Sequence, residues 1–380
     1  MTLFLLFFFF FYGGMHLYAF MKVHAALVLG ANTSVLLMIF MFMMVASPFI
    51  IRFLEKIGAE SAAKIMAYIG YTWLGVLFLF FSYSLATDIG RMVVFATEHL
   101  LRRRIPFVTL SAEHAFFLSL SLSLLTACYG YFEARNIRTE RITIKSQKIP
   151  VGMGTLRIVQ ISDVHLGLLV REDRLKKILD TVKDARPDIL VSTGDLVDGQ
   201  VCRIYALSDL LNEIRPRLGK FAITGNHEFY AGFDQAKCFT EEAGFRLLRG
   251  EAVTVADIIN IVGVDDPAVK ILKGSLSVSE KNLLAGIPRD KFTLFLKHRP
   301  LVDDESIGLF DLQLSGHVHK GQIFPFSIVT WLYYPVQAGF VSVAKDSFLY
   351  VSRGAGTWGP PIRFLAPPEI AIIDLAHKDI

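Results

Sequence analysis

Five short polar blocks in the last two thirds of this 380-residue chain carry side chains that bind metal ions. The blocks are Asp163-Val164-His165, GDLVD at 194–198, GNHE at 225–228, His298, and GHVH at 316–319. In an extended segment alternate side chains point to the same side, so Asp-x-His and His-x-His each offer two donors to one centre. The seven donors are Asp163, His165, Asp195, Asn226, His298, His317 and His319. They are enough for two divalent ions that share one carboxylate, and this nitrogen-rich set suits Mn²⁺, Fe or Zn²⁺ better than Ca²⁺.

Each block follows an apolar run of strand length. The runs are 156–161, 189–191, 221–223, 292–296 and 309–314, and helix-like stretches at 173–184 and 204–214 separate the first three. Strands that alternate with helices predict a layered α/β fold, in which ligands bind at the carboxyl ends of the strands. Ile142 and Ile144 alternate with polar neighbours and predict an edge strand ahead of this domain. We therefore expect the five blocks to meet at one end of a sheet.

In this order, the five blocks resemble those of the calcineurin-like metallophosphoesterases. The resemblance covers about residues 155–375 and implies an α/β domain with two mixed sheets sandwiched by helices. It also implies which residues hold two metal ions. One ion would be bound by Asp163, His165, Asp195 and His319, and the other by Asp195, Asn226, His298 and His317, with Asp195 bridging.

Two further segments are similar to a membrane-associated bacterial branch of this family. They are Gly321-Gln322 after the last block, and the end of the chain from Ser352-Arg353-Gly354 to Pro360-Pro361-Ile362-Arg363. Some relatives in that branch cleave the pyrophosphate of a nucleotide-linked acylated sugar. Apolar spans ahead of the catalytic domain also resemble the transmembrane proteins with a metallophosphoesterase domain.

The donor set predicts hydrolysis of a phosphoester. Two divalent ions, two carboxylates and a bridging hydroxide leave a net charge of about +1, which attracts phosphate, and the hydroxide would attack phosphorus in line. The leaving oxygen then needs a proton, and the resemblance implies His227 as the donor. We expect Asp198 to hold the imidazole of His227. Glu228 belongs either to this outer layer or to a surface cap.

The first third of the chain has a different composition. Residues 1–132 hold only 13 of the 74 charged residues, and the uncharged runs 1–21, 23–51, 65–87 and 114–132 are each long enough to cross about 30 Å of hydrocarbon as a helix. Residues 89–112 would lie flat as an interfacial helix or form a fifth pass. The chain is thus divided into a multi-pass transmembrane domain of about four α-helices (1–132), a linker and edge strand (133–154), and a metallophosphoesterase domain (155–380).

Charge also bears on location and partners. With four spans, eight cationic residues flank the membrane on the side of the C-terminal domain and five on the other, which favours a cytoplasmic catalytic domain on the cell (inner) membrane. A fifth pass would reverse this orientation. The net charge of +4, with no basic block beyond Arg102 to Arg104, gives no support for a nucleic-acid partner.

These observations predict a membrane-anchored, two-metal phosphoester hydrolase that acts on a lipid-linked or headgroup phosphate or pyrophosphate. Whether the substrate is a monoester or a diester stays open. One alternative is a non-catalytic, metal-dependent membrane sensor or scaffold, although all seven donors are present. Another is a transporter with a soluble regulatory part, although the spans lack charged residues and broken helices.

Aromatic residues near the last block allow two interpretations. Tyr205, Trp331, Tyr333, Tyr334 and Trp358 are expected in a core or an interface. The apolar stretch from Phe324 to Trp331 is expected as a buried strand or loop. The alternative is that this stretch enters a bilayer or lines a groove for an acyl chain.

Overall fold

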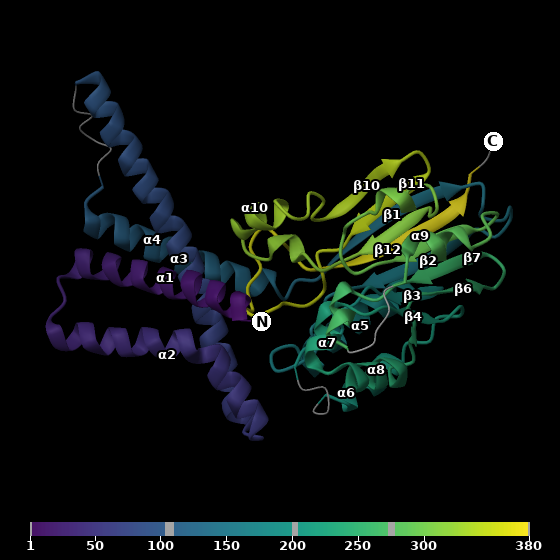
Figure 1. Ribbon diagram of the computed structural model, residues 1–380, viewed down its shortest axis with the longest axis horizontal. Helices are drawn as coiled ribbons and strands as arrows, with labels where there is room; N and C mark the ends of the chain where they lie inside the picture. Colours follow the sequence, from purple (N-terminus) through teal and green to yellow (C-terminus); the bar gives the residue numbers. More distant parts are fainter. Residues whose placement is uncertain (1, 103–109, 200–203, 273–277, 379–380) are drawn as a thin grey trace. The chain divides into compact units, whose positions relative to one another are not determined.

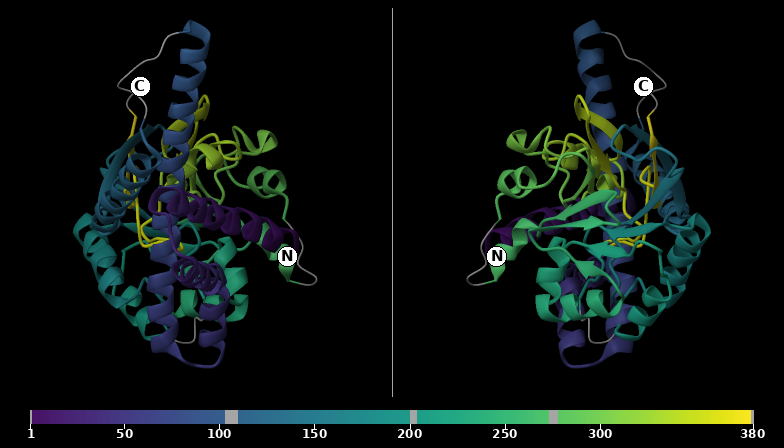
Figure 2. Two further views of the ribbon diagram at one scale, coloured as in Figure 1. Left: turned by 90° about the vertical axis from the view of Figure 1, so that its left-hand side faces the viewer. Right: turned by 90° about the vertical axis from the view of Figure 1, so that its right-hand side faces the viewer.

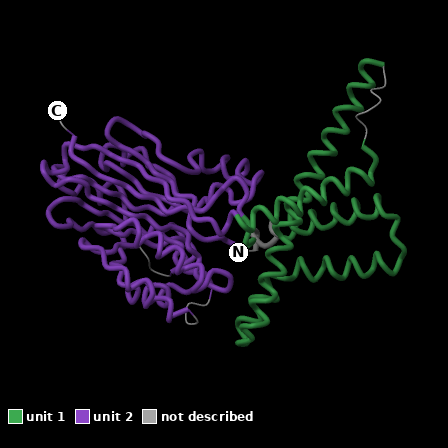
Figure 3. Tube along the Cα trace, turned by 180° about the vertical axis from the view of Figure 1, so that it is seen from behind, with its two compact units in different colours: residues 1–132, 359–362 green, residues 133–358, 363–380 purple. Residues whose placement is uncertain are grey.

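The computed structural model describes residues 2–102, 110–199, 204–272 and 278–378, with side chains from residue 9 onward. Arg103 and Arg104 lie outside the described residues. The chain divides into two compact units (Figure 3). Unit 1 comprises residues 1–132 and 359–362, and unit 2 comprises residues 133–358 and 363–380.

Unit 1 is built from long apolar helices (Figure 1): α1 (Thr2–Leu27), α2 (Ala31–Lys56), α3 (Glu60–Leu101) and α4 (Ala112–Glu133). Among the described residues, α2, α3 and α4 are long and apolar enough to cross a membrane. They contain most of the predicted runs 23–51, 65–87 and 114–132. The run 1–21 falls in α1, and its membrane crossing stays a prediction because some of its side chains are not described.

Helix α3 is much longer than its apolar run. It has 42 residues, which at 1.5 Å per residue is about 63 Å, roughly twice the thickness of the hydrocarbon layer. The prediction of a separate interfacial helix is wrong for residues 89–101, which continue α3. No proline follows the apolar run in these residues, so nothing breaks the helix there.

The first sheet of unit 2 has six strands in the order β1-β12-β2-β3-β4-β5. Strands β2 to β5 run parallel, β12 is antiparallel to β2, and β1 pairs in parallel with β12 at the edge. The edge position of β1 confirms the strand predicted around Ile142. The bounds are β1 (Arg138–Ser146), β2 (Thr155–Ile161), β3 (Ile189–Ser192), β4 (Lys220–Ala222), β5 (Arg246–Leu247) and β12 (Glu369–His377).

The second sheet also has six strands, in the order β10-β11-β9-β8-β7-β6. Its four central strands are parallel, and β10 and β6 pair antiparallel at the two edges. The run predicted at 309–314 is a strand only from Leu312. The bounds are β6 (Glu251–Val255), β7 (Ile259–Gly263), β8 (Phe292–Leu296), β9 (Leu312–Ser315), β10 (Gly339–Ala344) and β11 (Ser347–Val351).

Alternating side chains bind these sheets into layers. In β2, Ile158 belongs to a core shared with Leu294 of β8 and Leu312 of β9, so the two sheets face each other. Its neighbour Val159 points to the other face, where it belongs to a core with helical residues such as Leu175. This outer layer is formed by α5 (Glu172–Ala185), α6 (Ala206–Asn212) and α8 (Phe233–Glu242), which lie together beside the first sheet (Figures 1 and 2).

The outer face of the second sheet is covered by a smaller core. It includes Phe295 of β8, Phe310, and Leu284 of α9 (Glu280–Ala285). The layers therefore run helices, sheet, sheet, helix. The predicted fold class, an α-helical membrane region followed by an α/β domain with two mixed sheets between helices, is confirmed.

Candidate metal centre

The five polar blocks meet where strands of the two sheets end. Backbone hydrogen bonds hold the segments after β2 and β3 together, because Asp163 N donates to Gly194 O (3.0 Å) and His165 N donates to Asp195 O (3.0 Å). Across the second sheet, Gly316 N donates to His298 O (2.9 Å). The site is thus placed by backbone pairing at the carboxyl ends of parallel strands.

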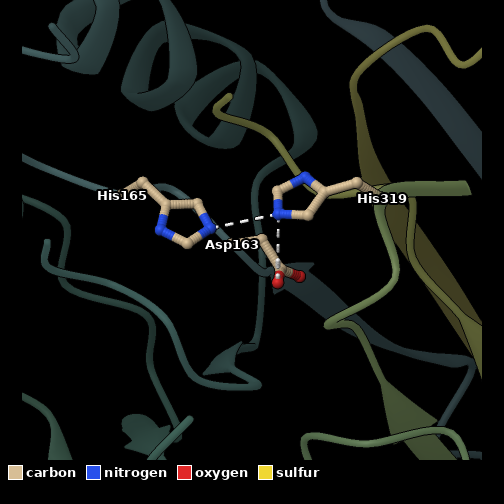
Figure 4. Close-up of side chains that lie close together, drawn as sticks. All are labelled: Asp163, His165 and His319. Carbon is tan, nitrogen blue, oxygen red and sulfur yellow. Dashed lines mark hydrogen bonds and ion pairs between the residues drawn. The ribbon is translucent and has the colours of Figure 1, made fainter. Parts of the chain in front are cut away.

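Asp163, His165 and His319 form a first group of donors (Figure 4). Nε2 of His165 lies 3.0 Å from Nε2 of His319, and Nε2 of His319 lies 3.6 Å from Oδ1 of Asp163. All three side chains are buried. Their donor atoms lie within 4.8 Å of one another, which is close enough to hold one metal ion.

Asp195, His298 and His317 form a second group of the same kind. Oδ2 of Asp195 lies 3.3 Å from Nε2 of His298, and that nitrogen lies 3.2 Å from Nδ1 of His317. The same Oδ2 lies 3.9 Å from Nε2 of His165 in the first group. One carboxylate therefore stands between the two groups, where a ligand shared by two ions would stand.

Asn226, the seventh predicted donor, lies at the start of α7 (Asn226–Ala231) directly after Gly225. Its side chain is buried, and its Oδ1 has no hydrogen-bond partner among the described residues. A buried amide oxygen without a partner is costly, and a cation would satisfy it. Nδ1 of His165 is likewise buried without a partner in the described part of the chain.

Two glycines allow this close packing. A β-carbon at Gly225 would lie 2.1 Å from Oδ1 of Asp195, and one at Gly316 would lie 2.2 Å from Oδ2 of Asp163. No side chain fits at either position without moving a carboxylate. The orphaned oxygen, the glycines and the nitrogen and oxygen donors together fit two divalent ions, whose identity they do not fix.

Five of the seven predicted donors have a left-handed backbone. The φ angles are 51° at Asp163, 54° at His165, 51° at Asp195, 73° at His317 and 46° at His319. Non-glycine residues rarely adopt this conformation, which costs about 1–3 kcal/mol each and concentrates at functional sites. Sequence spacing does not reveal this strain.

Burial sets the protonation of the histidines. It lowers the pKa of His165 to about 4 and that of His317 to about 3, so both rings are neutral at pH 7 and offer a lone pair. His298 differs. Burial lowers its pKa, but the charge and hydrogen bond of Asp195 together with the charges of Asp163 and Asp266 outweigh burial and raise the pKa of His298 to about 10. His298 Nδ1 lies 2.7 Å from the carbonyl oxygen of Thr193 and donates to it, which turns Nε2 towards Asp195.

His227 lies beside the donors, and Asp198 holds it. Its Nδ1 donates to Oδ1 of Asp198 (3.0 Å), and its backbone N–H donates to Oδ1 of Asp195 (2.9 Å). Burial lowers the pKa of His227, but the charges of Asp195 and Asp198 outweigh this and raise it to about 9. A ring nitrogen of His227 also lies within 4.8 Å of donor atoms of His165 and Asp195, so His227 can serve as a further metal ligand as well as a proton donor.

Glu228 is fully enclosed, so the alternative of a surface cap is wrong. Oε2 accepts the backbone N–H groups of Gly225 (2.7 Å) and Asp195 (3.0 Å), and Oε1 accepts that of Leu196 (2.7 Å). Burial and the charge of Asp195 raise the pKa of Glu228 to about 7. This carboxyl group joins the loop after β3 to the start of α7 and so fixes Asp195 relative to Asn226.

Arg363 lies beside the site, although no sequence pattern indicates a role for it there. It is the largest fully buried side chain among the described residues. Its guanidinium donates to the carbonyl oxygens of Arg353 (2.7 Å) and Gly356 (2.6 Å), and Nη2 lies 2.9 Å from Nδ1 of His319. Because a guanidinium only donates, His319 accepts at Nδ1, and its neutral ring carries the proton on Nε2. In this tautomer Nε2 has no free lone pair, so His319 would hold an ion through Nε2 only in the other tautomer, with the proton on Nδ1.

Several aromatic side chains near the site are exposed, which excludes a core position for them and leaves an interface as the prediction. Trp358, 5.9 Å from the ring of His227, is 52% exposed, and Trp331 and Tyr333 are 57% and 73% exposed. The stretch from Phe324 to Trp331 is also not a buried strand or loop. Residues Phe326–Trp331 form α10, none of whose residues is buried. Apolar character predicted burial here, but every residue of this helix is at least partly exposed.

A pocket of about 520 Å³ lies beside α10. Its lining includes Lys320, Ile328, Trp331, Gln337 and Arg353. Lys320 directly follows His319, so the pocket adjoins the last donor along the chain. Its apolar and cationic side chains make it able to accept a ligand that has both apolar and anionic parts.

Comparisons with known proteins agree with this site. The calcineurin-like phosphoesterase family model matches residues 156–321. An uncharacterized metallophosphoesterase of Aquifex aeolicus is 39% identical over 259 residues, which are 68% of this chain and 98% of that protein. A transmembrane protein with metallophosphoesterase domain from Danio rerio is 30% identical over 277 residues, which are 68% of this chain and 62% of that protein.

Solved structures are more distant. Haemophilus influenzae NAD nucleotidase matches with 15% identity over 53% of this chain and 46% of that chain, at a TM-score of 0.37. A score this low carries no argument about function. The assignment rests on the extent of the match to the Aquifex aeolicus protein, on the family model, and on the donor groups. The three candidate membrane helices and the transmembrane relatives indicate a membrane protein. The chain therefore belongs to the calcineurin-like metallophosphoesterases, a family of phosphoester hydrolases.

Proposed function

We propose that the chain is a membrane-anchored hydrolase whose metallophosphoesterase domain, residues 155–380, uses two divalent ions. Asp163, His165, Asp195 and His319 would hold one ion, and Asp195, Asn226, His298 and His317 the other. When bound, the ions polarise the phosphoryl oxygens and lower the pKa of a water between them. The observation that carries this proposal is the position of Asp195 between two groups of donors.

His227 gives the leaving oxygen its proton in this proposal. Asp198 fixes Nδ1 of the ring, which leaves Nε2 free to face a substrate. A positioned histidine of this kind contributes about 10²–10⁴-fold to the rate when the leaving group needs a proton. Glu228 contributes by holding the backbone of Asp195, and Arg363 contributes by holding the carbonyl groups of Arg353 and Gly356 beside His319.

A lipid-linked or headgroup phosphate is the proposed substrate class. Helix α4 ends at Glu133 and β1 begins at Arg138, so a very short linker joins a candidate membrane helix to the catalytic unit. Five residue steps reach at most about 18 Å. The pocket beside α10 can accept the part of the substrate beyond its phosphate. We place the catalytic domain on the cytoplasmic side of the cell (inner) membrane, as the positive charges favour.

Metal loading and hydrolysis test the proposed site together. The full chain in detergent, loaded with Mn²⁺, is expected to cleave an aryl phosphomonoester or phosphodiester. Asp195→Asn should lose bound metal and lower the rate of hydrolysis by more than about 100-fold. Mutation of residues that only hydrogen-bond to a metal ligand costs up to about 100-fold, and a ligand itself should cost more. The matched control is Asp180→Asn, an exposed residue of α5. A fully metal-loaded wild-type chain without hydrolysis would instead favour the sensor or scaffold.

The substrate needs a separate experiment. The metal-loaded chain is incubated with extracted membrane lipids and with nucleotide-activated lipid precursors, and mass spectrometry identifies the products. The proposal expects loss of a phosphate or nucleotide from a lipid. Hydrolysis of soluble phosphoesters alone would reject the lipid-linked substrate and leave the enzyme class standing.

A further inference from the structure

The segment between the last donor and β11 has an unusual composition for unit 2. From residue 321 to residue 344, 24 residues in a row carry no Lys, Arg, Asp or Glu, while about a quarter of residues 133–380 are charged. This is the longest uncharged stretch after residue 132. Lys320 and Lys345 stand at its two ends.

The segment displays its apolar side chains. Val329, Leu332 and Tyr333 are 48%, 70% and 73% exposed, and their spacing of three and four residues places them on one face of α10 and the turn that follows it. This outer face does not line the pocket, whose α10 residues include Ile328 and Trp331. A soluble domain rarely displays such a cluster unless another surface covers it.

The chemistry of this face matches a lipid surface. Trp and Tyr side chains prefer the boundary between headgroups and hydrocarbon, and aliphatic side chains on a short helix enter its outer layer. Lys320 is exposed at the start of the segment and is attracted to anionic headgroups. The rim of a protein interface usually carries charged residues, and residues 321–344 carry none.

Two further observations point to the bilayer as the occupant. The short linker after α4 limits how far unit 2 can move from the membrane in which α4 is inserted. The segment also adjoins the metal centre, because the ring of Tyr334 packs 5.3 Å from the ring of His317. In Figure 1, α10 projects from the end of unit 2 that also carries α7, the helix of Asn226.

We propose that the outer face of α10, formed by Val329, Leu332 and Tyr333, docks into the bilayer as a second membrane contact beside the metal centre. This contact is independent of the membrane-spanning helices and brings the donor groups level with lipid headgroups. It rests on α4 being inserted in the membrane and does not require that the chain hydrolyse any particular ester.

The test measures where α10 lies without using a substrate. The three cysteines are replaced by serine, and a single cysteine at residue 329 or 332 is labelled with a nitroxide. The full chain is placed in nanodiscs of phosphatidylethanolamine with a minority of phosphatidylglycerol. Electron paramagnetic resonance then gives the collision rates with oxygen, which concentrates in lipid, and with a water-soluble nickel chelate. Asp180 of α5, which is exposed, supplies the control position.

A docked helix should give a ratio of oxygen to nickel collisions several-fold higher at residues 329 and 332 than at residue 180. High collision rates with both reagents at residues 329 and 332 would mean that the face is in water and would overturn the proposal. Low rates with both would mean that protein covers it, either a second copy or the chain's own helices, and would also overturn it. Metal-dependent hydrolysis of an aryl phosphate by the labelled chains is measured separately, so loss of activity is not confused with loss of docking.

Discussion

His227 offers the sharpest test of how the site works, because two roles are open to it. As a proton donor it matters only when the leaving group needs a proton. As a metal ligand it matters for every substrate. His227→Gln separates these roles, since glutamine keeps an N–H group for Asp198 and a similar volume but cannot transfer a proton at neutral pH.

The structure sets the expected size of the effect. The ring of His227 is already held through Nδ1 by Asp198, and its backbone N–H is tied to Asp195, so little reorganisation is needed before proton transfer. We therefore expect the full contribution of a positioned acid, about 10²–10⁴-fold in kcat, for an alkyl phosphoester. This corresponds to about 3–5 kcal/mol of transition-state stabilisation.

The assay compares two leaving groups on the same protein. For a nitrophenyl phosphoester, whose leaving group is stable as an anion, His227→Gln should change kcat by less than about tenfold, or about 1.4 kcal/mol. Bound metal, measured by mass spectrometry of the elements, should be unchanged. The control is His377→Gln. His377 lies at the C-terminal end of β12, beside the start of β2 and away from the metal centre at the end of β2, and its ring contacts the carbonyl of Ile149.

An equal loss for both leaving groups together with loss of bound metal would refute the proton-donor role. It would instead make His227 a ligand in the group that it forms with His165 and Asp195. An equal loss with metal retained would show that His227 positions the substrate.

Four further outcomes follow from the geometry. Gly225→Ala should lose bound metal and lower the unfolding free energy by about 1–3 kcal/mol in a denaturant titration, because the new β-carbon would lie 2.1 Å from Oδ1 of Asp195. The control Gly286→Ala should change neither quantity, because its β-carbon would meet no atom closer than 3.6 Å. Arg363→Lys removes the planar fork from a buried site and should cost about 3 kcal/mol of unfolding free energy; a cost below about 1 kcal/mol would contradict its role. Chelation should lower the melting temperature, because ions at about 100 times their Kd add about 2.7 kcal/mol to the unfolding free energy. An unchanged melting curve would count against a metal site in the folded chain. Burial lowers the pKa of Lys220 to about 8 in the folded chain. Between about pH 8 and pH 10 the unfolded chain therefore binds more protons than the folded chain, and the unfolding free energy rises with pH. Lys220→Met should remove that rise, which denaturation curves of the wild type and the variant at several pH values would show.

The five blocks could be located from the sequence because each follows an apolar run of strand length. A buried parallel strand can be recognised from an apolar run that ends in a turn, so the predicted bounds of β2, β3, β4 and β8 are close to the observed ones. Strands β5, β6, β7, β10, β11 and β12 were not predicted. Strand β12 pairs with β1 and β2, far back along the chain, whereas β6 pairs with β7 and β10 pairs with β11 as antiparallel neighbours. Short apolar runs do not show which partner they will take.

Other features required three-dimensional packing. In the sequence Glu228 resembles an ordinary acidic residue in the first turn of a helix. It is buried because the loop after β3 packs over it and donates backbone hydrogen bonds to its carboxylate. Arg363 reads as a surface cation, yet the loops around it supply the carbonyl groups that make its burial tolerable. The opposite holds for α10, whose apolar sequence predicted burial although none of its residues is buried.

The left-handed backbone at five donor positions also restricts how this centre can evolve. Asp, Asn and His are the non-glycine residues that tolerate such a conformation best, whereas β-branched and bulky residues do not. These tolerated residues are also ligands with nitrogen and oxygen atoms. Mutation can therefore exchange one such ligand for another without rebuilding the loops, which allows the preferred metal to drift among Mn²⁺, Fe and Zn²⁺. A lineage that needed a sulfur-rich centre would have to replace the loops themselves.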